Sequence, residues 1–114
     1  MSVSVSIIVP CYNVAAYLDQ CMESLAGQSM EDIEIICVND GSSDRTAEIL
    51  REWRDRDGRV RVIDRKNSGV SAARNSGMEA AAGKYIGFVD PDDVVERNMF
   101  RRLFDAAVEK DADV

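Results

Sequence analysis

Short apolar runs alternate with longer amphipathic segments along this chain. Four of the runs are rich in β-branched or aromatic residues, as is typical of buried strands. They cover Val5–Val9, Ile33–Val38, Val60–Ile63 and Lys84–Val89. The run Val5–Val9 is closed by Pro10 and is expected to be a central strand. The run Val60–Ile63 alternates apolar with charged residues, so we expect it nearer an edge of the sheet.

Apolar residues recur at helical spacing in four further segments. Asn13 is expected to cap the first helix, and Ser43 or Asp44 the second, because their short side chains accept hydrogen bonds from free backbone amides. The third segment is rich in alanine and glycine, which favours close packing on a sheet. The four segments run from Asn13 to Gly27, from Ser43 to Gly58, over Ser71–Ala82 with Gly83 as its end, and from Met99 towards Asp113 and Val114.

The resulting order of elements is β-α-β-α-β-α-β-α. Alternation of this kind predicts an α/β fold of three layers, in which helices joined by right-handed crossovers cover both faces of a mainly parallel sheet. With 114 residues, no internal repeat and no linker, the chain is expected to form one domain, residues 1–114.

The composition excludes several classes of function. A net charge of −7 argues against nucleic acid or anionic lipid as a partner, and the absence of histidine excludes histidine triads and histidine metal ligands. No apolar run is long enough to span a bilayer, and the first residues do not resemble a signal peptide, so we expect a cytoplasmic protein. The three cysteines lie in apolar contexts without a Cys-x-x-Cys pair, which predicts buried, reduced thiols: Cys11, Cys21 and Cys37.

The last predicted strand leads directly into three carboxylates, Asp90, Asp92 and Asp93, around Pro91. Ligands bind at the carboxyl ends of strands in open α/β sheets, so chemistry is expected at this point. Three carboxylates this close together repel one another, and a divalent cation would relieve the repulsion; hard oxygen ligands suit Mg²⁺ or Mn²⁺. The structural alternative is a solvated turn in which Asp93 caps the helix that follows.

Two other predicted strand ends carry polar or aromatic residues. The first strand ends in Pro10, Cys11, Tyr12 and Asn13, and the second in Asn39, Asp40, Gly41 and Ser42. In a parallel sheet these segments share one edge with the acids. A stacking ring, a carboxylate beside a glycine turn and a metal-type acid cluster are together what a nucleotide diphosphate requires. Taken singly, each could be a structural residue of a core or a turn.

The usual phosphate-binding signatures are missing from the sequence. There is no Gly-x-x-x-x-Gly-Lys-Ser/Thr segment and no Gly-x-Gly-x-x-Gly after the first strand. A P-loop NTPase and a dinucleotide-dependent dehydrogenase are therefore not expected.

Four segments in this order resemble the signature segments of family 2 glycosyltransferases. They are Val5–Asn13 (VSIIVPCYN), Val38–Asp44 (VNDGSSD), Asn67–Gly77 (NSGVSAARNSG) and Phe88–Asp93 (FVDPDD). The resemblance covers nearly the whole chain. It implies a nucleotide-diphospho-sugar transferase fold of the GT-A type, and transfer of a sugar from the nucleotide to an acceptor, usually with inversion. It also suggests a place in polysaccharide or cell-wall biosynthesis.

The resemblance also implies roles for individual residues. The aromatic-containing segment and the glycine turn would bind the nucleotide, Gly69 and Arg74 would lie in the stretch that closes over it, and Asp90 would sit near the ribose. Asp92 would coordinate Mg²⁺ or Mn²⁺ between the two phosphates, with Asp93 and Asp90 beside it. The implied nucleotide-binding residues are Pro10, Tyr12, Asn13, Asp40, Gly41, Ser42, Gly69, Arg74 and Asp90.

The sequence departs from the family pattern in two respects. Pro91 stands where the family more often has a small residue, and Asn39 where it often has a second aspartate. Family members also continue past this point into a half that binds the acceptor and carries the catalytic base. We therefore expect residues 1–114 to be the donor-binding part, without the acceptor-binding half or a catalytic residue. Alone it should bind a nucleotide weakly with metal and transfer sugar poorly or not at all.

The resemblance implies partners as well. The expected donor is a nucleotide-diphospho-sugar, with a UDP-sugar first among the candidates, and the acceptor is an unidentified saccharide or lipid-linked molecule. The full-length protein would work in the cytoplasm or at the inner face of the membrane. An alternative from another class is a receiver-like domain or a non-catalytic α/β binding module, since the length, topology and acid cluster suit these too. The first strand, which ends in Pro10-Cys11-Tyr12-Asn13, lacks the paired acids that a receiver domain places there.

Overall fold

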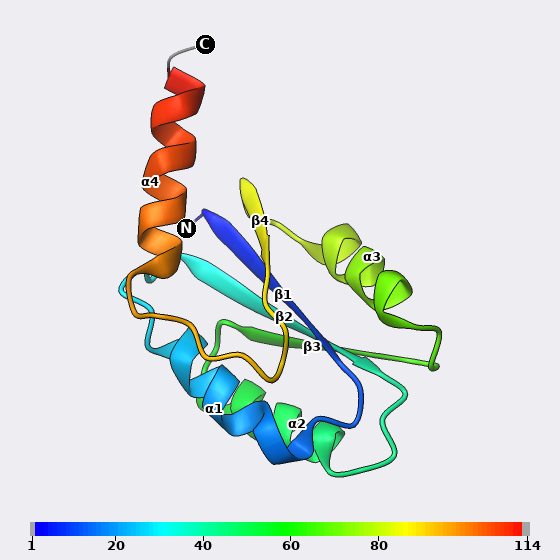
Figure 1. Ribbon diagram of the computed structural model, residues 1–114. Helices are drawn as coiled ribbons and strands as arrows, with labels where there is room; N and C mark the ends of the chain where they lie inside the picture. Colours follow the sequence, from blue (N-terminus) through cyan, green and yellow to red (C-terminus); the bar gives the residue numbers. More distant parts are fainter. Residues whose placement is uncertain (1, 113–114) are drawn as a thin grey trace.

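The computed structural model describes residues 2–112, so residues 113 and 114, towards which the last predicted helix ran, lie outside the described part. Strands and helices alternate from end to end, as predicted (Figure 1). The elements are β1 (Val5–Cys11), α1 (Ala15–Ala26), β2 (Ile33–Asp40), α2 (Thr46–Arg56), β3 (Val60–Arg65), α3 (Val70–Ala80), β4 (Tyr85–Phe88) and α4 (Met99–Ala112).

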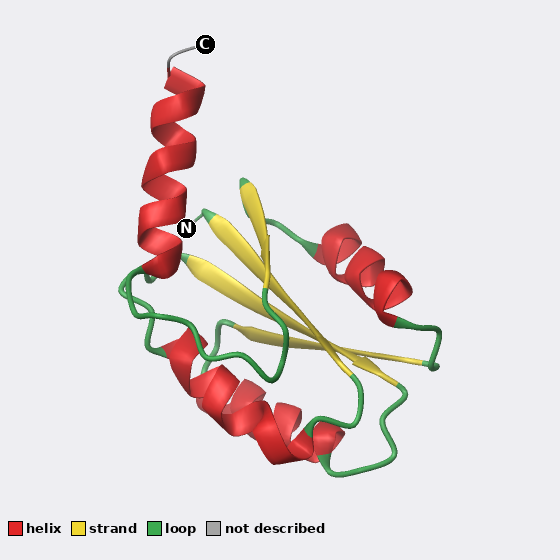
Figure 2. Cartoon of the chain, viewed as in Figure 1, coloured by secondary structure: helices red, strands yellow, loops and turns green. Residues whose placement is uncertain are grey.

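All four strands run parallel, in the order β3-β2-β1-β4. Helices α1 and α2 cover one face of the sheet and α3 covers the other, which gives the three layers predicted from the sequence (Figure 2). The α/β prediction is confirmed, as are the central position of β1 and the edge position of β3. Helix α4 starts against the α1 side of the sheet through Phe100 and then extends away from the other elements (Figure 1).

The two central strands are buried along their whole length. Successive side chains of a strand point to opposite faces of a sheet. Accordingly Ile7 and Val9 pack into the cluster under α1 and α2, while Ile8 packs against α3. Burial on both faces explains why these strands read as nearly continuous apolar runs.

Small residues bring α3 close to the sheet. Ala73 is fully buried, and a Cβ added to Gly77 would lie only 2.5 Å from Cγ2 of Ile8. The predicted close packing of this helix is thus confirmed, because a larger side chain at Gly77 would have to push the helix away from β1.

Gly83 does not end α3, which was a wrong prediction. The helix stops at Ala80, with Ala81 as its C-cap, and not at Ala82. Gly83 is needed instead for a close approach to β1: its N–H donates to Oγ of Ser6 at 2.8 Å, and an added Cβ would lie 2.6 Å from the Ser6 nitrogen. The glycine therefore marks tight backbone packing and not a helix terminus.

The three cysteines are free and buried, as predicted. No helix in residues 2–112 is both long and apolar enough to cross a lipid bilayer.

A buried carboxylate connects the amino-terminal half of the sheet to the end of α3. Glu34 on β2 is 6% exposed and accepts hydrogen bonds from Oγ of Ser6 at 2.6 Å, from the N–H of Ala82 at 2.6 Å and from Arg61 at 2.9 Å. Burial by itself would raise the pKa of Glu34, but these three donors outweigh burial and lower it. The carboxylate is thus held in its charged form.

Replacing Glu34 with glutamine is expected to destabilise the fold by about 1–3 kcal/mol at pH 7, because an amide cannot satisfy all three donors. A carboxyl whose folded pKa is lowered contributes stability above its unfolded pKa and loses that contribution as the pH falls through the folded pKa. The difference in urea midpoint between wild type and E34Q should therefore shrink in acid. E79Q, at an exposed position of α3, serves as the control. A difference that grows towards acid pH would contradict this assignment.

Candidate functional site

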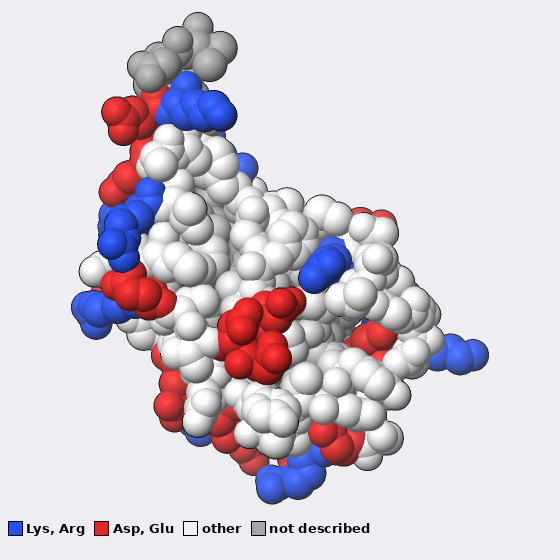
Figure 3. Space-filling view, viewed as in Figure 1, with Lys and Arg blue, Asp and Glu red and all other residues white. Residues whose placement is uncertain are grey.

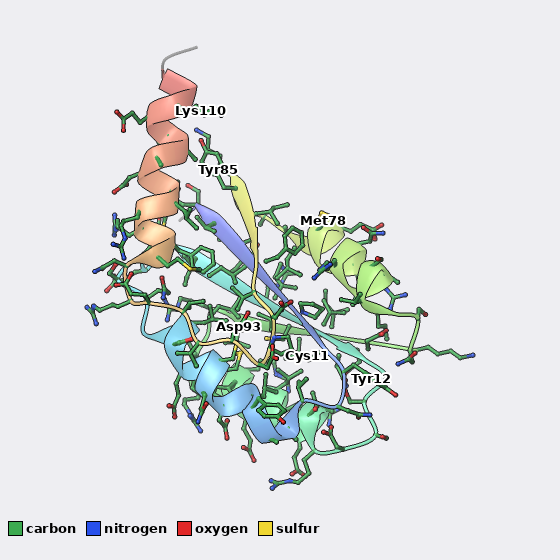
Figure 4. The ribbon with its side chains drawn as sticks, in the orientation of Figure 1. Cys11, Tyr12, Met78, Tyr85, Asp93 and Lys110 are labelled. Carbon is green, nitrogen blue, oxygen red and sulfur yellow. The ribbon has the colours of Figure 1, made fainter. Side chains whose placement is uncertain are left out.

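Three loops meet at the carboxyl ends of the strands. They connect β1 to α1, β2 to α2 and β3 to α3, and the turn that follows β4 lies beside them (Figure 1). In Figure 4, Tyr12 lies at the end of β1 and Asp93 lies across from Cys11 on the segment after β4. The parallel sheet thus brings the three sequence segments singled out above to one edge.

A pocket of about 300 Å³ opens between these loops. Residues from the ends of β1 and β2, from the loops after β1 and β3 and from the start of α3 form its wall: Pro10, Cys11, Tyr12, Asp40, Asn67, Gly69, Val70 and Ala73. Tyr12 is 53% exposed, so it is accessible to a stacking partner. Of the residues that the family resemblance implied for nucleotide binding, Pro10, Tyr12, Asp40 and Gly69 line this pocket, whereas Asn13, Gly41 and Ser42 do not.

Asp40 holds the β3–α3 loop in place. Asp40 is 3% exposed. Its two carboxylate oxygens accept hydrogen bonds from the N–H groups of Ser68 and Gly69, each at 2.9 Å. Nε of Arg65 lies 3.5 Å from the same carboxylate. Asp40 therefore fixes the loop that carries Gly69 and also contributes to the pocket wall.

Gly41 permits this close arrangement. Its φ is +71°, a conformation that favours glycine, and an added Cβ would lie 2.6 Å from the backbone nitrogen of Asn67. Nδ2 of Asn67 in turn donates to the backbone oxygen of Asp40 at 3.0 Å. The β2–α2 and β3–α3 loops are thus packed backbone against backbone beside the pocket.

Asn13 does not cap α1, which was a wrong prediction. The cap position of α1 is Val14, and it makes no side-chain capping bond. Oδ1 of Asn13 instead accepts from the N–H groups of Ser43 and Asp44, at 2.8 and 3.3 Å, just before α2. The N–H of Asn13 donates to Oγ of Ser42 at 3.0 Å. Asn13 and Ser42 thus join the first two loops.

The carboxylates of Asp90, Asp92 and Asp93 form one exposed cluster, in which an oxygen of each lies within 4.8 Å of the others. Acidic side chains gather at the centre of the face seen in Figure 3. The segment is a turn closed by a hydrogen bond from the N–H of Asp93 to the oxygen of Asp90 at 3.0 Å. Helix α4 starts only at Met99, so Asp93 does not cap it, and the capping alternative was wrong.

The donor atoms of this cluster fit a hard divalent cation, because they are all carboxylate oxygens. Cys21 lies directly beneath the turn, with Sγ 3.7 Å from the backbone oxygen of Asp90. Burial, followed by the charges of Asp93, Asp92 and Asp90, raises the pKa of Cys21 to about 12. The thiol is therefore protonated, as its position as donor to the Asp90 oxygen requires.

Arg74 lies between the acid cluster and the apolar residues of β4. Its Nη2 is 3.6 Å from Oδ1 of Asp90, and its guanidinium carbon is 6.0 Å from the centre of the Phe88 ring. Within residues 2–112, Nε of Arg74 is buried without a hydrogen-bond partner. Arg74 and Asp90 line a second pocket of about 360 Å³, together with Phe88, Val89, Asp93, Val95 and Met99. The Arg74 guanidinium, which has one unpaired nitrogen, thus lies next to a possible metal site.

The sequence reasoning assigned no role to three residues that shape the first pocket: Asn67, Val70 and Ala73. They belong to the segment Asn67–Gly77 that carried part of the family resemblance. Val70 is the first residue of α3 and half-exposed, which is an unusual place for a β-branched apolar residue and is the signal that could have found it.

Comparison with known proteins identifies the family. Residues 6–114 match the family described as Glycosyl transferase family 2. The chain belongs to this family. It is 52% identical over 110 residues to the uncharacterized glycosyltransferase EpsJ of Bacillus subtilis, covering 96% of this chain and 32% of EpsJ.

Solved structures agree with the family 2 assignment. The structure of S. aureus TarS 1–349 in complex with UDP-GlcNAc is 33% identical to this chain, with a TM-score of 0.82, and the match covers 96% of this chain and 31% of TarS 1–349. The mannosyltransferase PcManGT of Pyrobaculum calidifontis, in complex with GDP-Man and Mn²⁺, has the same fold, with a TM-score of 0.76 at 22% identity over 82% of this chain and 29% of its own. The predicted GT-A fold is thus confirmed. The family 2 chain spans about a third of the length of these relatives.

Proposed function

We propose that residues 1–114 are the donor-binding part of a family 2 glycosyltransferase, which binds a nucleotide-diphospho-sugar together with Mg²⁺ or Mn²⁺. One observation carries the proposal: a pocket with an open tyrosine ring stands at the same sheet edge as three clustered carboxylates and a partly unpaired arginine. The complexes of TarS with UDP and with UDP-GlcNAc support a UDP-sugar as the donor.

The base occupies the first pocket in this proposal. The ring of Tyr12 stacks on the base, and Pro10 and Val70 provide apolar contact on the pocket wall. Asp40 meets the base at the inner end of the pocket, with lone pairs that remain beside its bonds to the loop amides. Gly69 gives the ligand room, since nothing lies within 4 Å of an added Cβ there.

The diphosphate extends from this pocket towards the acid cluster. Asp90 lies nearest the ribose, while Asp92, with Asp93 and Asp90, holds the divalent cation. When bound, the cation would act as a Lewis acid that stabilises negative charge on the departing nucleotide diphosphate. Arg74 places a second positive charge beside the same phosphates, because its guanidinium lies next to Asp90.

The reaction assigned to the full-length protein is transfer of the sugar to a saccharide or lipid-linked acceptor, with inversion at the anomeric carbon. We assign no catalytic base to residues 1–114. The acceptor site, the role in polysaccharide or cell-wall biosynthesis and the cytoplasmic location stay predictions. The receiver-like alternative is not retained, because the family match covers residues 6–114.

Thermal unfolding tests the proposed donor binding on the chain as it exists. UDP at about ten times its dissociation constant, with Mn²⁺ present, is expected to raise the Tm by about 5 °C, because a ligand that binds only the folded state stabilises it. UDP without a divalent cation, and inorganic phosphate with Mn²⁺, should shift the Tm much less. Equal shifts with phosphate and with UDP would argue against a nucleotide site.

A further inference from the structure

Two loops at the donor-binding edge are joined by a reciprocal set of hydrogen bonds. From the first loop, Oδ1 of Asn13 accepts from the N–H groups of Ser43 and Asp44 at 2.8 and 3.3 Å, and the Asn13 N–H donates to Oγ of Ser42 at 3.0 Å. These amides lie in the β2–α2 loop, before Arg45, the cap residue of α2. One side chain of the β1–α1 loop therefore holds the backbone of the next loop at this edge.

Side chains of the β2–α2 loop and of the first residue of α2 bind the start of α1 in turn. The N–H of Val14 donates to Oγ1 of Thr46 at 3.0 Å, and the N–H of Ala15 donates to Oδ2 of Asp44 at 3.2 Å. Thr46 is fully buried, and Oδ1 of Asp44 also accepts from the Thr46 N–H at 2.9 Å. Asp44 and Thr46 thus bind the first amides of α1, Asp44 also binds the first amide of α2, and with the bonds of Asn13 the two loops form one unit.

Tyr12 depends on this unit for its position. It is the residue before Asn13, at the end of β1 (Figure 4). It lines the first pocket and is more than half exposed. Packing around such a side chain is weak, so the course of the backbone decides where the ring stands. Asn13 has a φ of +51°, a conformation that asparagine, aspartate and glycine tolerate better than other residues. The turn at Asn13 and its bonds across to the β2–α2 loop together set the backbone of Tyr12.

We propose that Asn13 is a positioning residue for donor binding, which acts through Tyr12 and does not itself touch the nucleotide. This inference rests on the proposed function. Asn13 fixes the loop before the ligand binds. The ring of Tyr12 is then already in position, and less binding free energy is lost in ordering it. Tyr12 forms part of the pocket wall, whereas Asn13 does not. This difference distinguishes a positioning role for Asn13 from direct contact with the nucleotide.

Two substitutions at Asn13 separate its backbone conformation from its hydrogen bonds. N13G keeps the tolerance for positive φ and removes the acceptor. N13D keeps both the tolerance for positive φ and an acceptor oxygen, in a place before a helix where a negative charge is favourable. N98G is the matched control, because Asn98 is exposed and lies outside both pockets.

The experiment is a calorimetric titration of the full chain and its variants with UDP in the presence of Mn²⁺, and with Mn²⁺ alone. N13G is expected to bind UDP about tenfold more weakly than wild type, because loss of the side-chain hydrogen bonds between the two loops and the ordering of one side chain each cost a few-fold in affinity. N13D should bind within a few-fold of wild type, N98G should match it, and Mn²⁺ alone should bind equally to all. Unchanged binding of Mn²⁺ also shows that N13G is folded.

A double-mutant cycle with Y12A measures whether the effect of Asn13 on UDP affinity depends on the Tyr12 ring. A merely structural role of Asn13 would show no such dependence. If Asn13 acts through the ring, N13G costs no further affinity once Tyr12 is alanine. The proposal is overturned if N13G binds UDP as tightly as wild type, or if its tenfold loss persists in full in the Y12A background. Failure of the wild-type chain to bind either UDP or GDP is a different result, which overturns the proposed function and the inference with it.

Discussion

Replacing Asp92 with alanine is expected to weaken the binding of UDP in the presence of Mn²⁺ by about a hundredfold or more. Asp92 is the middle acid of the exposed cluster, and the oxygens of all three acids lie within 4.8 Å of one another. Without Asp92 the cation loses one of its few protein ligands, and the negative diphosphate then faces the remaining carboxylates without full neutralisation. Calorimetric titration with UDP, with and without Mn²⁺, measures the effect.

A matched substitution separates loss of the cation ligand from loss of charge in general. D105A removes an exposed carboxylate from α4, away from the cluster, and should leave UDP affinity unchanged. D92A should also leave the free energy of unfolding within about 0.5 kcal/mol of wild type, because Asp92 is exposed. Equal affinity of D92A and wild type for UDP in Mn²⁺ would remove Asp92 from the proposed metal site.

Replacing Gly41 with valine is expected to destabilise the chain by about 2–4 kcal/mol and to weaken UDP binding by about tenfold. The φ of +71° is strained for valine, and the added Cβ would stand 2.6 Å from the backbone nitrogen of Asn67. That backbone cannot move without disturbing Asp40, to which Asn67 and the next two residues of its loop donate. Urea unfolding gives the stability and calorimetry gives the affinity.

Gly58 is the control glycine for this test. It lies between α2 and β3, has no atom within 4 Å of an added Cβ and has no positive φ. G58V should therefore change neither property by more than a small amount. A G41V chain as stable as G58V would mean that the two loops are not packed as tightly as described.

Hydrophobic pattern was enough to place the elements of the sheet. Strands β1 and β2 were predicted to within two residues at each end, because both of their faces are buried and their sequences are nearly continuous in apolar residues. The alternating pattern of Val60–Ile63 correctly indicated an edge strand. The acid cluster was also predictable, since its three residues fall within one turn and need no distant partner to come together.

Contacts between distant segments explain the wrong predictions for Asn13 and Gly83. Asn13 fits the local rule for a helix cap, but its partners are Ser43 and Asp44, thirty residues away. Gly83 fits the rule for a helix end, but it is required for an approach to Ser6, which lies 77 residues earlier. In both cases the residue type was a correct signal of an unusual backbone environment, and the neighbour that explains it lies on another element.

The central claim is that this family 2 chain carries a metal-dependent nucleotide-diphosphate site at the carboxyl edge of its sheet. The most direct test is calorimetric titration of the purified chain with UDP and with GDP, each with and without Mn²⁺. We predict that UDP binds, that Mn²⁺ strengthens its binding by about a hundredfold or more, and that GDP binds more weakly. Absence of binding by both nucleotides, or binding that is the same without a cation, would contradict the claim.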